Sequence, residues 1–71
     1  MEISYDKDAD ALYIEFQKGK FAKNKKLDAF TILDLDKNDH ILGLELLNVA
    51  KRLPKKALAE VHLKNLLPVM T

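Results

Sequence analysis

The side chains with most potential for chemistry are acidic and lie in two short segments. One segment has the spacing of an EF-hand calcium loop, with possible oxygen ligands at Asp34, Asp36, Asn38 and Glu45. Position six of such a loop needs glycine for its sharp turn, but Asp39 stands there. If the flanking segments are strands, Glu45 also lies away from the turn. We interpret the segment as a hairpin turn, with metal binding by these four residues as the alternative.

A second acidic pattern consists of Asp6, Asp8 and Asp10. Three carboxylates in one loop suit a hard cation, but aspartate also favours turns because its side chain accepts hydrogen bonds from nearby backbone N–H groups. We interpret these residues as turn formers. Asp34 and Asp36 are predicted to share a strand face about 7 Å apart, and paired carboxylates can divide acid and base roles. A chain of 71 residues leaves little room for the pocket that such a pair needs.

Nucleophilic catalysis has little support in the residue types present. Ser4 is the only serine, and neither histidine, His40 or His62, has a recognisable catalytic partner. A glycine-rich phosphate loop is excluded, because the chain has only Gly19 and Gly43. We therefore expect a protein that is not an enzyme and that has no cofactor.

The first part of the chain has the residue pattern of β-strands separated by turns. Leu12, Ile14 and Phe16 alternate with polar neighbours, a period of two that predicts a half-buried strand. A short strand is expected before it, at residues 3–5, and the lysine-rich segment 21–28 is predicted to be an edge strand.

Two further segments, 30–35 and 40–47, flank turn residues and predict a hairpin. Its second strand would place Leu42, Leu44 and Leu46 on one face. Ile41 falls on the other face by the same alternation, together with Leu47. The hairpin is therefore expected to be covered in part on both sides.

The pattern changes at Asn48, which is expected to cap a short turn. Pro54 suits the first turn of a helix, and a helix is predicted from Lys55 to about Leu66, with Pro68 ending it. Strands followed by a helix indicate an α+β fold: a small antiparallel β-meander of four to five strands and a C-terminal helix. We expect a single domain over residues 1–71, with the meander at 1–47 and the helical tail at 48–67.

Composition limits the class of protein. The chain is 48% hydrophobic and 32% charged, as in globular proteins, and it has no cysteine, so disulfides and thiolate metal sites are excluded. No apolar run reaches the roughly 18–20 residues that span a bilayer, and the first residues do not resemble a signal peptide. The expected location is the cytoplasm, without membrane contact.

The net charge of +1 is too small to indicate a polyanionic partner. A basic cluster of Lys51, Arg52, Lys55 and Lys56 could contact phosphates. All aromatic residues lie at or before Phe30, however, so this cluster lacks a side chain on which a base could stack. Nucleic-acid binding is therefore disfavoured, and an acidic protein surface is the preferred partner for these cations.

Two stretches together resemble a known bacterial family. They are Ile3-x-Tyr5-Asp6-x-x-Ala9-Asp10-Ala11-Leu12-Tyr13-Ile14, and Ile32-Leu33-Asp34-Leu35-Asp36 followed by Ile41-x-Gly43-x-Glu45-x-Leu47-Asn48-x-Ala50. They are similar to the small uncharacterised proteins of domain of unknown function 2283, over roughly residues 3–53. The resemblance implies an antiparallel β-meander followed by helix, with no established enzymatic activity. It also suggests an antitoxin role, because some similar proteins are encoded beside small toxin-like proteins.

These observations favour a non-enzymatic protein-interaction module, with an antitoxin-like partner of a small toxin as one form of it. A protein partner or self-association is expected, and a homodimer is plausible because so short a chain buries little surface alone. The expected interaction residues are Lys51, Arg52, Leu63, Leu66 and Leu67. The alternatives are a metal- or ligand-binding domain that uses the acidic turns, and a nucleic-acid binder that uses residues 51–56.

Overall fold

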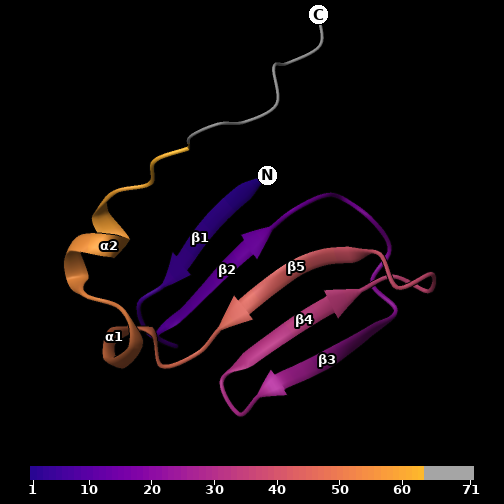
Figure 1. Cartoon of the computed structure of the whole chain (residues 1–71), viewed down its shortest axis with the longest axis horizontal. Helices are drawn as coiled ribbons and strands as arrows, with labels where there is room; N and C mark the ends of the chain where they lie inside the picture. Colours follow the sequence, from indigo (N-terminus) through magenta and orange to yellow (C-terminus); the bar gives the residue numbers. More distant parts are fainter. Residues whose placement is uncertain (64–71) are drawn as a thin grey trace, which may run out of the picture.

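The computed structural model describes residues 1–63. It contains five strands and two short helices, and it confirms the α+β fold (Figure 1). The strands are β1 (Glu2–Asp6), β2 (Ala11–Glu15), β3 (Lys23–Asp28), β4 (Thr31–Leu35) and β5 (Ile41–Leu46). All neighbouring strands are antiparallel, and each overlaps a segment from which a strand was predicted.

The strand order across the sheet is β1-β2-β5-β4-β3, which places β5 in the middle. The sheet therefore joins two antiparallel units, the β1–β2 hairpin and the β3–β4–β5 meander, through the pairing of β2 with β5. The connection from β2 to β3 runs along one end of the sheet (Figure 1). Backbone hydrogen bonds hold it there, from Phe16 to Leu42 at 2.8 Å and from Ala22 to Leu35 at 2.9 Å.

Strand register sorts the side chains onto two chemically different faces, because successive residues of a strand point to opposite sides. We call one side the apolar face; it carries Ile3, Tyr5, Leu12, Ile14, Leu33, Leu35, Ile41, Leu44 and Leu46, with Lys23 and Lys25 along β3. We call the other side the acidic face; it carries Glu2, Glu15, Asp34 and Glu45 around Tyr13 and Gly43, with Lys26 on β3. One hydrophobic and one charged face are common in antiparallel sheets.

A β-bulge changes the predicted orientation of Ile41. The register between β4 and β5 shifts so that Asp34 pairs with Gly43 and Leu35 pairs with Ile41, which leaves Leu42 as the extra residue. Ile41 consequently lies on the apolar face, beside Leu35. The expectation that Ile41 lies opposite Leu44 was wrong, because simple alternation does not include the extra residue.

The core within the described residues is small. Val49 is fully buried, and Leu35 and Leu42 are nearly so. Gly19, in the β2–β3 connection, lies so close to the Leu42 side chain that a Cβ atom there would overlap it. Most other apolar side chains of the sheet are half-buried or exposed, so residues 1–63 leave much of their apolar surface incompletely buried.

Two short helices follow the sheet, α1 (Val49–Arg52) and α2 (Lys55–Ala59). Asn48 occupies the N-cap position of α1, with φ of 52°. Its side chain makes no capping hydrogen bond, so the predicted side-chain cap was wrong. The predicted helix from Lys55 ends at Ala59, and Glu60 is extended, with φ of −135°. A helix this short, with no fully buried side chain, has little tertiary packing to extend it.

Candidate functional site

The most unusual surface in the described structure is the apolar face. The register aligns Ile3, Ile14, Leu44 and Leu33 across four neighbouring strands, and the row ends on β3 at Lys25. Neither helix is long enough to cover such a row. Ile3, on the outer strand β1, is 40% exposed, and Ile41, on the central strand β5, is 44% exposed. A contiguous apolar surface of this kind is typical of an interaction site.

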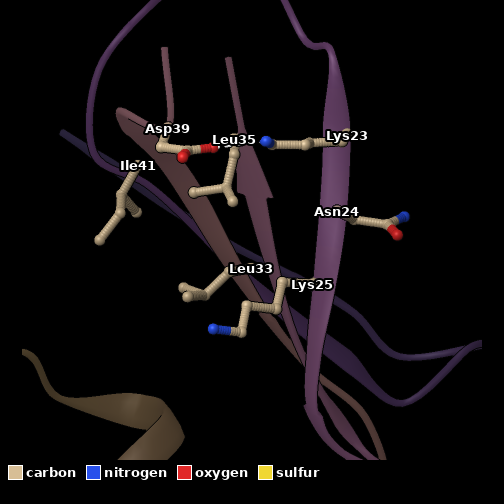
Figure 2. A pocket seen from close by; sticks show the side chains of 7 residues that line it. All are labelled: Lys23, Asn24, Lys25, Leu33, Leu35, Asp39 and Ile41. Atoms are coloured by element: carbon tan, nitrogen blue, oxygen red, sulfur yellow. Dashed lines mark ion pairs between the residues drawn. The ribbon is translucent and has the colours of Figure 1, made fainter. Parts of the chain in front are cut away.

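An open hollow of about 540 Å³ lies on the β3–β4–β5 part of the apolar face. Figure 2 shows Leu33, Leu35 and Ile41 lining it, and Lys25 extending over it from β3. Asn24 points to the other side of the sheet in the same view. The hollow is therefore apolar where the strands are central and cationic along the β3 margin.

The two lysines on this margin differ in their partners. Lys23 forms an ion pair with Asp39, with 2.6 Å between Nζ and Oδ1, at the turn between β4 and β5 (Figure 2). Lys25 has no ion-pair partner among residues 1–63. A cation beside an apolar surface and without a carboxylate of its own is available to an acidic group of a binding partner.

The acidic face has a different construction, centred on Tyr13. The Tyr13 hydroxyl donates a hydrogen bond to Oδ2 of Asp34 at 3.1 Å, across β5. The ring lies directly over Gly43, where any Cβ atom would overlap it. Burial raises the pKa of Tyr13, and the hydrogen bond to Asp34 and the charges of Asp34, Glu15 and Glu45 raise it further. This arrangement joins three strands and gives Asp34 a structural partner.

The acidic residues of the EF-hand-like segment are distributed over the hairpin. Asp36 accepts hydrogen bonds from the backbone N–H groups of Asn38 at 2.8 Å and His40 at 2.9 Å, and its other oxygen lies 2.9 Å from Nδ1 of His40. These contacts, first the backbone N–H of His40, lower the pKa of Asp36. Asp34 faces Tyr13, and Glu45 lies within β5. Residues 1–63 contain no group of three or more histidine or acidic side chains placed to hold a metal ion.

Aspartates of the other acidic segment also accept hydrogen bonds from backbone N–H groups. Asp6 accepts hydrogen bonds from the N–H groups of Asp8 at 2.9 Å and Ala9 at 3.2 Å, as predicted for a turn former. Asp10 has a role that sequence reasoning missed. Both of its carboxylate oxygens lie 3.1 Å from the backbone nitrogen of Ala50, 40 residues away, so Asp10 binds the first turn of α1. The only signal in the sequence was its place in the family pattern.

The predicted interaction residues differ in their contacts and exposure. The Arg52 guanidinium donates to the carbonyl oxygen of Phe30 at 2.7 Å and to Oγ1 of Thr31 at 2.8 Å, so it ties α1 to the β3–β4 turn. Lys51 is exposed near it. Leu63 is 65% exposed at the end of the described chain. Leu66 and Leu67 lie outside the described residues.

One further observation concerns membranes. No helix within residues 1–63 has the length and hydrophobicity required to cross a bilayer. The longer of the two helices, α2, has five residues.

Comparison with known proteins gives one match. The family model described as protein of unknown function (DUF2283) matches residues 2–49, which include all five strands and the buried Val49. The chain belongs to this family. No curated protein and no solved structure matches the chain.

The DUF2283 match covers the sheet and ends at the first residue of α1, so α2 lies beyond it. Several residues by which the family was recognised have structural roles in this DUF2283 protein. Gly43 leaves room for the Tyr13 ring, and Asp10 binds the N–H of Ala50. The matched residues therefore include side chains that hold the sheet together and one, Asp10, that binds α1.

Proposed function

We propose that this DUF2283 protein is a non-enzymatic protein-interaction module and that the apolar face is its binding surface. The observation that carries the proposal is the row of apolar side chains across the sheet, which the described helices leave open. Burial of apolar surface is worth about 25 cal/mol per Å², so covering this face with a partner offsets part of the cost of association. The shallow, open shape of the face suits a protein surface better than a small molecule, which normally binds in a deeper cleft.

The charge pattern supports a partner with acidic groups around an apolar centre. Lys25 extends over the hollow without an ion-pair partner in the described residues, and Lys23 lies beside it. A charge at the rim of an interface mainly steers association and selects the partner, whereas the apolar centre provides most of the affinity. The module would therefore recognise an apolar surface that carries carboxylates at one margin.

A pair of neighbouring residues on β3 provides the test. Lys25 lies on the apolar face and Lys26 on the acidic face, so Lys25→Glu and Lys26→Glu make the same change in net charge on opposite sides of the sheet. Tagged wild-type and variant chains would be purified from their native host after cross-linking, and the proteins attached would be quantified. We expect a specific complex that Lys25→Glu weakens and Lys26→Glu leaves intact. Equal loss in both variants would contradict binding through the apolar face.

The antitoxin-like role is one form of this function, in which the occupant of the apolar face is a small toxin-like protein. Its support is the family to which the chain belongs and the open face described above. If a toxin-like protein encoded nearby arrests growth, co-expression of this chain should relieve the arrest. Relief should be lost in Lys25→Glu and retained in Lys26→Glu. Failure of the wild-type chain to relieve the arrest would rule out that form of the function.

A further inference from the structure

We propose that the occupant of the apolar face is a second copy of this chain, docked face to face about a two-fold axis parallel to β5. This inference rests on the proposed function, because it names the partner of the same face. It would give the chain the second layer that a one-sided sheet needs to bury its apolar side chains.

The size of the face fits a partner of the same kind. With about 4.8 Å between strands and about 3.3 Å per residue, the five strands form a surface of roughly 24 by 18 Å. This flat area of roughly 430 Å² is a lower bound, because the relief of the side chains adds surface, and a standard interface starts at about 600 Å² per partner. Two such faces at the usual separation of about 10 Å would form a β-sandwich.

The edges of the sheet favour pairing by faces rather than by edges. The outer strand β3 carries Lys23, Lys25 and Lys26, and the outer strand β1 carries Glu2 and Asp6. Charged residues on edge strands oppose the addition of another strand. The apolar face has no such protection over β2, β5 and β4. Face-to-face docking also closes after two copies, because both use the same surface.

The charge pattern selects the direction of the axis. Because β5 is the central strand, an axis parallel to β5 places it over its own copy and places β3 of one chain over β1 of the other. On the apolar face, Lys25 of β3 then lies over Ile3 of β1, which is next to Glu2 in the chain, and no lysine of that face lies over another. An axis across the strands would place β3 over β3 and bring lysines together. Avoiding this repulsion therefore favours the parallel axis.

Substitution of Lys25 is a specific test of the proposed dimer. Lys25 ends the row that begins at Ile3, so the parallel axis places it near Ile3 of the partner subunit. The neighbouring residue there is Glu2 of the partner subunit, on an outer strand with no strand of the same sheet beyond it. Glu2 points to the acidic face, so its carboxylate must pass round this outer strand to pair with Lys25.

The first experiment measures the mass of the purified full chain in solution by sedimentation equilibrium over a range of concentrations. We expect a dimer for the wild type. Lys25→Glu should raise the dissociation constant about tenfold, because an attraction becomes a repulsion. The double variant Glu2→Lys/Lys25→Glu should restore the dimer, and Lys26→Glu should leave it unchanged. Circular dichroism checks that each variant is folded.

The second experiment uses the absence of cysteine from the chain. Leu44→Cys places one thiol on the central strand of the apolar face, and Glu45→Cys places one on the acidic face. A short bis-maleimide should link two copies of the Leu44→Cys chain and should not link copies of the Glu45→Cys chain. This readout does not depend on the charges of β1 and β3.

The outcomes separate the two proposals. A wild-type chain that is monomeric at about 100 μM overturns self-pairing, because a useful homodimer forms well below that concentration. Equal weakening by Lys25→Glu and Lys26→Glu, or equal cross-linking of the two cysteine variants, overturns it as well. The proposed function fails separately, if the chain forms no complex, with itself or another protein, that Lys25→Glu weakens selectively.

Discussion

The Tyr13 hydroxyl and the Asp34 carboxylate meet over Gly43, 3.1 Å apart, and so connect β2 to β4 across the central strand β5. Each of the three residues depends on the others. The ring requires glycine beneath it, and the carboxylate receives its hydrogen bond only if the ring crosses β5. The acidic face therefore has a specific side-chain contact at its centre, in addition to the backbone ladder.

Removal of the Tyr13 hydroxyl tests this contact. Tyr13→Phe should lower the free energy of unfolding by about 0.5–1.5 kcal/mol, because one partly buried hydrogen bond is lost and the ring remains. Urea unfolding at neutral pH measures the change. Tyr5→Phe is the comparison: its hydroxyl bonds to Asp10 at 2.7 Å at an exposed position, where we expect a smaller loss.

The same variant has an expected dependence on pH. Because the folded-state pKa of Tyr13 is raised above its usual value of 10.0, the folded chain holds this proton more tightly than the unfolded chain does. The resulting stability is fully present below the unfolded pKa and is lost as the pH rises through the folded pKa. The stability difference between wild type and Tyr13→Phe should therefore shrink in alkaline solution. A difference that grows there would contradict the contact.

Gly43→Ala tests the space beneath the ring. The added methyl group would overlap Tyr13 and lies 3.0 Å from the carbonyl oxygen of Ile14, so we expect a loss of about 1–3 kcal/mol. The same substitution made in a Tyr13→Ala background should cost less, because the ring is then absent. Urea unfolding of all four chains gives the coupling. Equal costs in both backgrounds would show that the ring does not determine the need for glycine.

Asp10→Ala tests the attachment of α1. The substitution removes the acceptor of the Ala50 N–H and places alanine at a position with φ of 52°. Losing a helix cap costs about 1 kcal/mol, and the left-handed conformation adds roughly 1–2 kcal/mol for alanine. Thermal unfolding measures the change. Asp8→Ala, in the same turn, is the control, because no hydrogen bond of the Asp8 carboxylate is present in the described structure; its effect should stay within about 0.5 kcal/mol.

The lowered pKa of Asp36 is expected to cause part of the loss of folding stability in acid. Its pKa is lowered in the folded chain by hydrogen bonds from the backbone N–H groups of His40 and Asn38, so the folded chain binds this proton less readily than the unfolded chain. This contribution is present above the unfolded pKa of about 3.9 and is lost as the pH falls through the folded pKa. Asp36→Asn should therefore lose less stability than the wild type between about pH 5 and pH 2. Urea midpoints across that range test it, and equal losses in the two chains would contradict this role of Asp36.

The strands were predictable because the residues of a half-buried strand alternate between apolar and polar types, according to the side of the sheet that each one faces. The alternation of Leu12 and Ile14 with polar neighbours records one covered side and one solvated side. The lysines of β3 likewise indicated an edge strand, and β3 lies at the edge of the sheet. The turn-forming role of Asp6 was also predictable, because its hydrogen bonds go to residues two and three positions away.

The candidate site could be predicted only in part. The sequence showed apolar residues on alternating positions, but their alignment into one face depends on which strands are neighbours. Pairing of β2 with β5 aligns Ile14 with Leu44, and nothing local to either strand specifies that pairing. The segments proposed from composition, around Lys51 and Arg52, proved to include an arginine that holds α1 to the Phe30 carbonyl.

The sequence by itself therefore determined the strands, the turns and the family, because these depend on residues close together in the chain. Tertiary structure decided that Ile41 joins the apolar face, since a bulge is a property of two paired strands. It also decided that Asp10, rather than Asn48, binds the first turn of α1, since that contact spans 40 residues. Long-range pairing brought Tyr13, Gly43 and Asp34 together, and the same pairing created the open face through which we propose that this protein binds.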